Sequence, residues 1–395
     1  MKNKLSILIG FILIVVIFFY LNATKKEPIK INVPRGDAFS YINQENFFAI
    51  NNIREVKIVE KHIQAPKNIR AVYMSSWIAS SVSLRSKLVD FIVDSEVNTI
   101  VLDIKDYSGL IAFDIDHPLI DNYKTDSKRI PDISNFIKEL HSKNIYIIGR
   151  LTLFQDPLLA QAKPELAFKR LDNGEVWKDK KGLAFINPQK EDAWEYFAVI
   201  AEESHKLGFD EINFDYIRYP SDGNISNLNY SLNGKKRTDV MKSFYEFLDN
   251  RLRTQNIPIS ADLFGLTTAL EDDLSIGQDI DDALVHFDAV APMVYPSHYN
   301  SGYLGFSNPA DHPYEMIYSE MTKARLRAER NGLKGNSLRT WIQDFDLGAD
   351  YEKDEIKAQI KASYDAGIYS YMVWDPKNIY TKSAYYNNIK DNDNE

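Results

Sequence analysis

The segment LGFDEINFDYIRYP, residues 207–220, contains one complete unit of the fold that we predict for this chain. Leu207 and Gly208 end an amphipathic stretch, because glycine readily adopts the left-handed conformation that closes a helix. Residues 211–217 follow as a short run of mostly apolar and aromatic side chains, the composition of a buried parallel strand. Pro220 then stops the run. The segment therefore predicts a helix, a tight link and a buried strand.

The same alternation repeats along most of the chain. Helical stretches are predicted at residues 84–97, 192–207, 240–252, 314–331 and 355–366. Strand-like runs occur at residues 71–77, 99–105, 145–151, 211–217, 257–264, 289–295, 338–343 and 369–374. Short links between helices and strands imply a parallel sheet, and eight such units suit an α/β fold of the closed (β/α)8 TIM barrel type. We assign this barrel to residues 69–395.

An open, doubly wound sheet is the alternative to a barrel. Such a sheet would be expected to carry a glycine-rich phosphate-binding loop after its first strand. Residues 78–83, which follow the first predicted strand, contain no glycine. The closed barrel is therefore the favoured prediction.

The N-terminus has the composition of a membrane-targeting segment. Lys2 and Lys4 precede an apolar run at residues 5–21, which is close to the minimum of about 17 residues for spanning a bilayer. Residues 22–25 form a poor cleavage site, so we favour an uncleaved transmembrane signal anchor at residues 1–24 over a cleaved signal peptide. Residues 25–68 are predicted to be a spacer with a short strand at 56–59. The barrel would then be extracytoplasmic on a single-pass cell-membrane protein, or secreted if cleavage occurs.

Composition excludes several classes of function. The net charge of −9 argues against nucleic acid as a partner, because phosphate binding relies on clustered lysine and arginine. Cysteine is absent, which excludes disulfides, cysteine-ligated zinc and thiol catalysis. Aromatic residues make up 12% of the chain, and their faces suit both sugar stacking and core packing.

Polar side chains gather at the predicted C-terminal ends of the strands, where the chemistry of such barrels takes place. Buried charges are costly unless they are paired, so this asymmetry points to a site. The side chains concerned are Asp103, Lys105, Asp106, Arg150, Asn213, Asp215, Arg218, Tyr219, Asp262, Tyr295, His298, Gln343, Asp344, Trp374 and Asp375.

Asp215 and Asp262 are the candidate catalytic residues. Each lies in an otherwise apolar predicted strand, and neighbouring strands lie about 4.8 Å apart. Two inward carboxylates at that spacing can flank one glycosidic bond, where one protonates the leaving oxygen and the other attacks or activates water. The alternative for Asp215 is a structural carboxylate paired with Arg150 or Arg218.

Other chemistries fit the strand ends less well. Asp103, Lys105 and Asp106 are expected to form a local ion network, which either positions substrate or serves structure alone. Lys105 is the one candidate for a Schiff-base lysine, and His298 the one histidine placed for a metal site. We therefore expect neither metal nor cofactor. Six aromatic residues near strand ends are candidate sugar platforms or core residues: Trp77, Tyr219, Tyr295, Tyr299, Trp341 and Trp374.

Four segments carry a family resemblance: RAVY at 70–73, VLDIKD at 101–106, GFDEINFDYIRYP at 208–220 and APMVYP at 291–296. Together they resemble a bacterial family of TIM-barrel glycoside hydrolase domains, over about residues 69–385. That family is distantly similar to the α-amylase type of glycosidase. The resemblance implies a nucleophilic Asp on strand 4, which Asp215 matches, and a third carboxylate after strand 7, which Asp344 roughly matches. Strand 5 carries Asp262 where the type has Glu, so Glu271 is an alternative acid.

These observations predict a glycoside hydrolase that cleaves a surface or extracellular polysaccharide, with a carbohydrate as its partner. Asp215 would be the nucleophile or base and Asp262 the general acid. Substrate contacts are expected from the remaining strand-end residues, namely Asp103, Lys105, Asp106, Arg150, Asn213, Arg218, Tyr219, Tyr295, His298, Gln343, Asp344 and Trp374. The alternative is a catalytically inactive barrel that binds glycan and has a structural role in the cell envelope.

Overall fold

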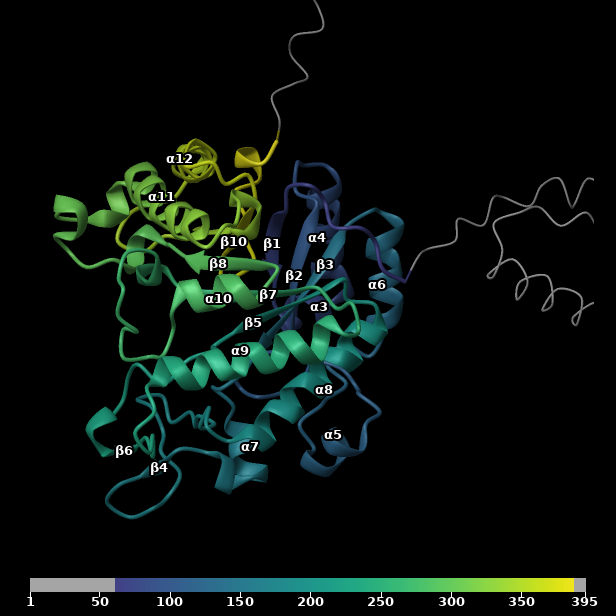
Figure 1. The fold of residues 1–395 in the computed structure, drawn as a ribbon. Helices are drawn as coiled ribbons and strands as arrows, with labels where there is room; N and C mark the ends of the chain where they lie inside the picture. Colours follow the sequence, from purple (N-terminus) through teal and green to yellow (C-terminus); the bar gives the residue numbers. More distant parts are fainter. Residues whose placement is uncertain (1–60, 387–395) are drawn as a thin grey trace, which may run out of the picture. The chain divides into compact units, whose positions relative to one another are not determined.

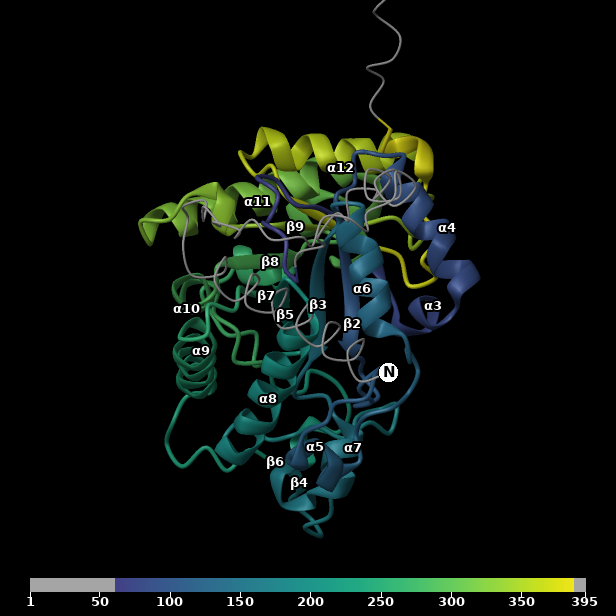
Figure 2. The same cartoon turned by 90° about the vertical axis from the view of Figure 1, so that its right-hand side faces the viewer.

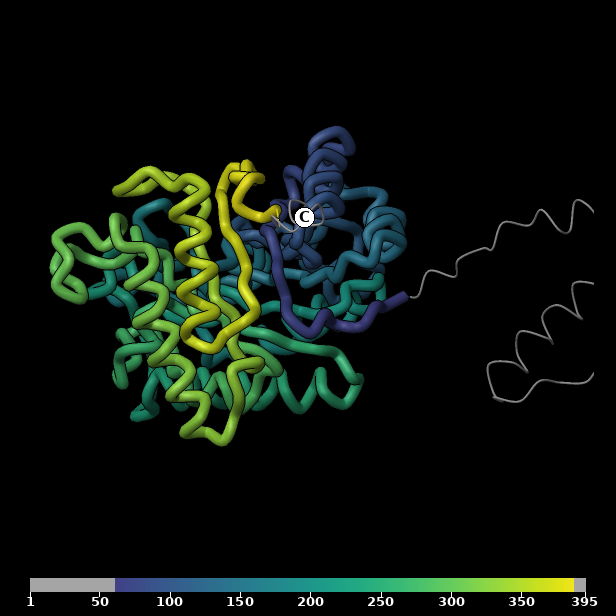
Figure 3. Tube along the Cα trace, turned by 90° about the horizontal axis from the view of Figure 1, so that it is seen from above, coloured from purple at the N-terminus to yellow at the C-terminus, as the bar shows by residue number. Residues whose placement is uncertain are grey.

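The computed structural model describes residues 61–386. Within them, eight parallel strands form a closed barrel in the order β1-β10-β9-β8-β7-β5-β3-β2. The strands are β1 (Arg70–Met74), β2 (Thr99–Lys105), β3 (Tyr146–Thr152), β5 (Glu211–Asp215), β7 (Ile259–Phe264), β8 (Ala289–Met293), β9 (Thr340–Gln343) and β10 (Tyr371–Trp374) (Figure 1). The first strand pairs with the last, and Figure 3 shows these purple and yellow segments side by side. The predicted barrel is confirmed, and the open sheet is wrong.

Each predicted run overlaps one barrel strand, but several predictions extended too far. Strand β5 ends at Asp215 rather than 217, and β8 ends at Met293 rather than 295. The reason is that apolar residues continue beyond the last strand hydrogen bond. Ile217 and Val294 are fully buried although they lie in loops. These loop residues are apolar because they are buried, so the sequence looks like a strand beyond the point where the strand ends.

Helices surround the barrel (Figure 2). The predicted helical stretches correspond to α4 (Val82–Val93), α8 (Glu191–Leu207), α9 (Arg237–Arg253), α11 (Pro313–Arg330) and α12 (Lys353–Asp365). Helix α8 ends at Leu207, and Gly208 follows with φ 123°, as the glycine predicted. Shorter helices for which no range was predicted are α3 (Ser76–Ser80), α5 (Pro118–Tyr123), α6 (Ile133–Ser142), α7 (Pro157–Ala162) and α10 (Ile280–His286).

The loops that follow β2, β3 and β5 carry additional structure. They hold α5, α7 and a small antiparallel sheet of β4 (Lys169–Arg170) and β6 (Leu228–Asn229). Figures 1 and 2 both place these elements together at one end of the described chain. Because they follow the strands, they lie beyond the C-terminal ends of the barrel.

The barrel interior combines apolar packing with buried ion pairs. Tyr146, Met372 and other inward side chains form an apolar cluster distinct from the layer between strands and helices. In the same interior, Arg339 Nη1 and Nη2 donate to Glu211 at 2.5 and 2.9 Å. Glu211 is the first residue of β5 and Asp215 the last, so this ion pair lies at the opposite end of the strand from the predicted catalytic carboxylate.

A register shift in β2 separates two residues that were expected to act together. The pairing of β2 with β3 shifts between Asp103 and Lys105. Side chains two positions apart on a regular strand point to the same face, but an inserted residue changes that relation. Asp103 accordingly contacts Arg150 inside the barrel, whereas the Lys105 ammonium pairs with Asp156 at 2.8 Å and lies over the Phe197 ring.

Several N-terminal predictions lie outside the described residues. The signal anchor at 1–24 and the strand at 56–59 belong to this part of the sequence. Among residues 61–386, none of the helices has the length and apolar character needed to cross a bilayer. Residues 61–69 form neither helix nor strand, and the Ile63 N–H donates to Asp210 at 2.8 Å.

Candidate active site

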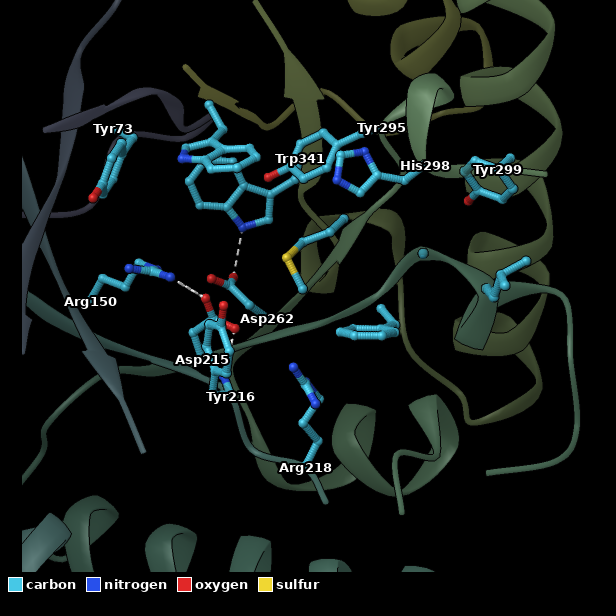
Figure 4. A pocket seen from close by; sticks show the side chains of 15 residues that line it. Tyr73, Arg150, Asp215, Tyr216, Arg218, Asp262, Tyr295, His298, Tyr299 and Trp341 are labelled. Atoms are coloured by element: carbon cyan, nitrogen blue, oxygen red, sulfur yellow. Dashed lines mark hydrogen bonds and ion pairs between the residues drawn. The ribbon is translucent and has the colours of Figure 1, made fainter. Parts of the chain in front are cut away.

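A cavity of about 400 Å³ opens at the C-terminal ends of the strands. It is lined by Tyr73, Arg150, Asp215, Tyr216, Arg218, Asp262, Phe264, Gly265, Leu266, Met293, Tyr295, His298, Tyr299, Trp341 and Trp374 (Figure 4). These residues come from seven of the described barrel strands or the turns that follow them, with β2 as the exception. The cavity therefore lies at the end of the barrel where such folds carry out chemistry.

Asp215 is held at the end of β5 by contacts to both of its oxygens. Arg150 Nε and Nη2 donate to Oδ2 at 3.0 and 2.5 Å. The next residue, Tyr216, has φ 53°, a left-handed conformation that is costly for a residue with a side chain. This turn directs the Tyr216 N–H to Asp215 Oδ1 at 2.6 Å. These charge-assisted hydrogen bonds fix the orientation of the carboxylate at the end of the strand.

Arg150 joins Asp215 to a second carboxylate. Its Nη1 atom donates to Asp103 Oδ1 at 2.7 Å, and the Tyr73 hydroxyl donates to Asp103 Oδ2 at 2.5 Å. Burial raises the pKa of Asp103, while the charge of Arg150 opposes that shift. The expected contact between Asp215 and Arg150 is thus present. Because Asp215 also lines the cavity, this contact orients the carboxylate without removing it from the site.

Asp262 lies on β7, the barrel neighbour of β5, and has different surroundings. Trp341 Nε1 and Asn213 Nδ2 donate to its Oδ1 atom at 2.7 and 2.9 Å. Burial and the negative charge of Asp215 raise the pKa of Asp262 to about 8. This shift favours the protonated, neutral form of Asp262. Among residues 61–386, both of the hydrogen bonds that it accepts go to Oδ1, which leaves Oδ2 for that proton.

Aromatic rings form much of the remaining wall. The rings of Tyr295 and Trp374 lie 5.4 Å apart, and Trp341 lies against the carboxyl group of Asp262. His298 lies 5.2 Å from Tyr295, and burial lowers its pKa, so its ring is neutral at neutral pH. Flat apolar faces beside a few polar groups are well suited to stacking against sugar rings.

The predicted site residues divide into three groups by position. Arg150, Asp215, Arg218, Asp262, Tyr295, His298 and Trp374 line the cavity, as do the predicted platforms Tyr299 and Trp341. Asp103, Asn213 and Gln343 lie behind this wall and contact its residues or its loops. Lys105, Asp106, Tyr219, Asp344 and the alternative acid Glu271 do not line the cavity.

The expected network of Asp103, Lys105 and Asp106 is wrong. Asp103 pairs with Arg150, Lys105 with Asp156, and Asp106 with Arg129 at 2.9 Å. The register shift in β2 is the physical reason, because it turns Lys105 away from the barrel interior. The Lys105–Asp156 pair is fully buried and joins the β2 and β3 segments outside the barrel.

Asp344 is occupied elsewhere. Its Oδ2 atom accepts from the Thr381 N–H at 2.9 Å and from the Tyr385 hydroxyl at 2.8 Å, and Oδ1 accepts from the Thr381 hydroxyl at 2.8 Å. It therefore holds the segment after β10, and the position implied by the α-amylase resemblance is not at the cavity. Tyr219 is likewise buried, against Phe168 and Tyr230.

Some lining residues were not predicted: Tyr73, Tyr216, Phe264, Gly265, Leu266 and Met293. Gly265 offered a signal, because a glycine directly after a strand often marks close backbone approach. A Cβ atom there would lie 2.5 Å from the Met293 carbonyl oxygen and 2.6 Å from the Tyr299 hydroxyl. Tyr73 also offered one, as an aromatic residue near the end of the first strand.

A closed (β/α)8 barrel with two buried carboxylates on neighbouring strands at its catalytic end is the arrangement typical of glycoside hydrolases. Among residues 61–386 there is no cluster of three or more histidine, aspartate or glutamate residues suited to a metal ion. The chain belongs to the family described as "Putative glycosyl hydrolase domain", whose match covers residues 71–380.

One of the similar solved structures agrees with the barrel fold over most of this chain. The glycoside hydrolase domain of PgaB (BpsB) from Bordetella bronchiseptica is 13% identical, with a TM-score of 0.59 over 81% of this chain and 99% of that chain. A hypothetical protein from Ruminiclostridium thermocellum is 33% identical over 48% of this chain and 96% of that one, with a TM-score of 0.45. None of the curated proteins matches the chain.

Proposed function

We propose that the protein is a glycoside hydrolase that cleaves a surface or extracellular polysaccharide. The observation that carries the proposal is the difference between the two cavity carboxylates. Asp215 accepts two hydrogen bonds from Arg150, whereas Asp262 is buried, has a pKa raised to about 8 and lies close to the charge of Asp215. One carboxylate and one carboxylic acid in the same cavity are the pair that glycosidic bond cleavage requires.

In the proposed mechanism, Asp262 is the general acid. Its Oδ2 atom donates a proton to the glycosidic oxygen as the bond to the anomeric carbon breaks, which makes the leaving group a neutral alcohol. Asp215 stabilises the positive charge that develops on the sugar, as a nucleophile or as the base for a water molecule. The oxygen of a water molecule then bonds to the anomeric carbon, and the water gives up a proton. If Asp215 has formed a covalent bond to the sugar, that bond breaks and Asp262 takes the proton; if water attacks directly, Asp215 takes it and exchange with solvent returns one to Asp262.

Other residues would position these groups and the sugar. Arg150 orients Asp215 through two hydrogen bonds, and Trp341 with Asn213 orients Asp262. Tyr295 and Trp374 would stack against sugar rings. Asp103 contacts the cavity residues Arg150 and Tyr73 but does not line the cavity, so it is a positioning residue in this proposal rather than a catalytic one.

The test is release of reducing ends from a broad panel of polysaccharides by the full-length chain in detergent, with Asp215→Asn and Asp262→Asn assayed in parallel. We expect release by the wild type and loss of release in both variants. Wild-type binding to a glycan without any release would instead support the alternative, an inactive glycan-binding barrel. Equal release by the wild type and both variants would contradict the proposed site.

The pH profile should report the proton on Asp262. Because the acid must be protonated, we expect the pH profile of kcat/KM to have a descending limb that begins near pH 8. Along this limb, kcat/KM should fall about tenfold per pH unit. The Trp341 hydrogen bond lowers the pKa of Asp262, so Trp341→Phe should move this limb to higher pH. Profiles from pH 5 to 10 would measure it, with Trp374→Phe as the control. A limb that stays in place in Trp341→Phe would show that another group is the acid.

The N-terminal segment would place the barrel outside the cytoplasm. This proposal rests on the two lysines and the apolar run at 5–21. With an epitope at the C-terminus, we expect protease added to intact cells, or to spheroplasts where an outer envelope blocks access, to digest the barrel. Sedimentation with membranes would distinguish an anchor from a cleaved signal. Full protection of the epitope until the membrane is disrupted would contradict the orientation.

A further inference from the structure

Arg218 is the cavity residue whose position the mechanism leaves unexplained. It follows β5 directly in the loop that leaves the catalytic strand, and only 8% of its surface is exposed. It is one of the residues that line the cavity, and Figure 4 shows its guanidinium directed toward the cavity interior, below Asp262. A cation is thus buried beside the two carboxylates that we assign to catalysis.

The hydrogen bonds of Arg218 leave much of its guanidinium unsatisfied. Nη1 donates to the Tyr219 carbonyl at 3.0 Å and to the Ser221 hydroxyl at 3.2 Å. Within the described part of the chain it forms no ion pair with a carboxylate, and its Nε and Nη2 atoms have no hydrogen-bond partner. Arg150, the other arginine of the cavity, pairs with both Asp103 and Asp215.

Aromatic rings fix the guanidinium in place. It lies 4.8 Å from the centre of the Phe264 ring, 5.0 Å from that of Tyr216 and 5.8 Å from that of Phe185. Such contacts attract a cation and restrict its rotamers, but they leave its charge uncompensated. Arg218 is therefore held ready for a partner rather than already bound to one.

Burial of a cation without a counter-ion is unfavourable. Desolvation lowers the pKa of Arg218, and the negative groups that oppose this shift, including Asp215, Asp222 and Asp179, act on it without an ion-pair contact. Burying a charge costs free energy unless the charge is paired and hydrogen-bonded. An arginine at this position is thus better explained by a ligand than by packing.

We propose that Arg218 binds an oxyanion on the substrate, so that the cavity is selective for an acidic glycan. The guanidinium offers two adjacent N–H donors in a fixed plane, the geometry that matches a carboxylate or a phosphate group. Because His298 is neutral and Arg150 is engaged by two carboxylates, Arg218 is the lining cation suited to this role. The inference deepens the proposed hydrolase function and rests on it for the orientation of the bound sugar.

The test is equilibrium binding to the full-length chain, followed by tryptophan fluorescence, since Trp341 and Trp374 line the cavity. The acidic probes are glucuronate and galacturonate, which carry a carboxylate, and glucose 6-phosphate, which carries a phosphate. Glucose and galactose are the neutral controls. Ionic strength is held constant with sodium chloride. We expect the acidic sugars to bind about tenfold more tightly than the neutral ones, as for a hydrogen-bonded charge pair.

Variants then assign the preference to one residue. Arg218→Gln should abolish the preference for acidic sugars, and Arg218→Lys, which keeps the charge without the planar fork, should retain part of it. Arg253→Gln removes an arginine whose side chain is 55% exposed and should leave the preference unchanged. Thermal melts of each variant verify folding. Tighter binding of the uronates would identify the oxyanion as a carboxylate, and tighter binding of glucose 6-phosphate would identify it as a phosphate.

The results separate this proposal from the hydrolase function. Equal binding of acidic and neutral sugars by the wild type, or an acidic preference that survives in Arg218→Gln, would overturn the anion site. Hydrolysis of a neutral glycan could still be observed in that case. Conversely, a preference for acidic sugars that is lost in Arg218→Gln would support the anion site even if the protein cleaves no polysaccharide.

Discussion

Replacement of Asp215 by Asn is expected to lower kcat by about 10⁴-fold, as the loss of a nucleophile or base does in other enzymes. Asparagine has nearly the same shape, and its carbonyl oxygen can still accept hydrogen bonds from Arg150 or from the Tyr216 N–H. It cannot, however, attack an anomeric carbon or take a proton from water. Glycan binding and thermal stability should therefore remain while turnover disappears.

The measurement is initial-rate release of reducing ends, together with binding of the same glycan to the variant. Asp172→Asn is the matched control, because Asp172 is an exposed carboxylate paired with Arg170 outside the cavity. If Asp215→Asn keeps more than about a tenth of the wild-type rate, the residue is not the nucleophile or base. Loss of binding together with rate would instead indicate a role in holding the substrate.

Replacement of Arg150 by Met is expected to lower the free energy of unfolding by about 3–5 kcal/mol at neutral pH. The arginine is the shared partner of Asp103 and Asp215, both of which are buried. Methionine preserves most of the side-chain volume but leaves two carboxylates without their cation. Catalytic activity should fall as well, since Asp215 would lose the contacts that orient it.

The pH dependence of that loss has a definite sign. Arg150 lowers the pKa of Asp103, so its removal raises that pKa further above the value in the unfolded chain. A carboxyl group with a raised pKa in the folded state destabilises the fold progressively as pH rises above its unfolded pKa of about 4. Chemical denaturation should therefore show a deficit that grows from pH 4 toward neutrality and shrinks on acidification.

An arginine on the surface supplies the control for this experiment. Arg253→Met removes exposed ion pairs with Asp249 and Asp288 and should cost less than about 1 kcal/mol. A similar loss of stability in both variants would mean that the buried bridge contributes no more than a surface contact.

The barrel was predictable because its signals are local. Buried parallel strands require continuous apolar runs, and glycine or asparagine ends many of the helices, as Gly208 does after α8. The limits of the strands were less predictable, since Ile217 is buried by tertiary packing beyond the end of β5. An apolar composition indicates that a segment is buried. The limits of a strand are set instead by its hydrogen bonds to the neighbouring strands.

The carboxylates of the site were predictable from position, but their environments were not. Asp215 and Asp262 lie at the ends of strands whose apolar runs are visible in the sequence. Burial and the charge of Asp215 raise the pKa of Asp262, and hydrogen bonds from Trp341 and Asn213 oppose that shift. The partners of Asp344 come from the segment after β10. These contacts join distant parts of the chain. The shift in β2 that redirects Lys105 likewise has no marker among residues 101–106, which contain neither glycine nor proline.

Closure of the barrel by β1 and β10 has a consequence for how activity arises during folding. The hydrogen bond from the Ile69 N–H to Ser370 Oγ joins residues 301 positions apart, and the cavity draws its lining from Tyr73 through Trp374. Contacts of such high sequence separation form late and slowly. A chain synthesised from its N-terminus would complete its cavity only after the last strand, β10, had been made. Hydrolysis would thus show that the barrel has closed. Helix content measured by circular dichroism does not show this.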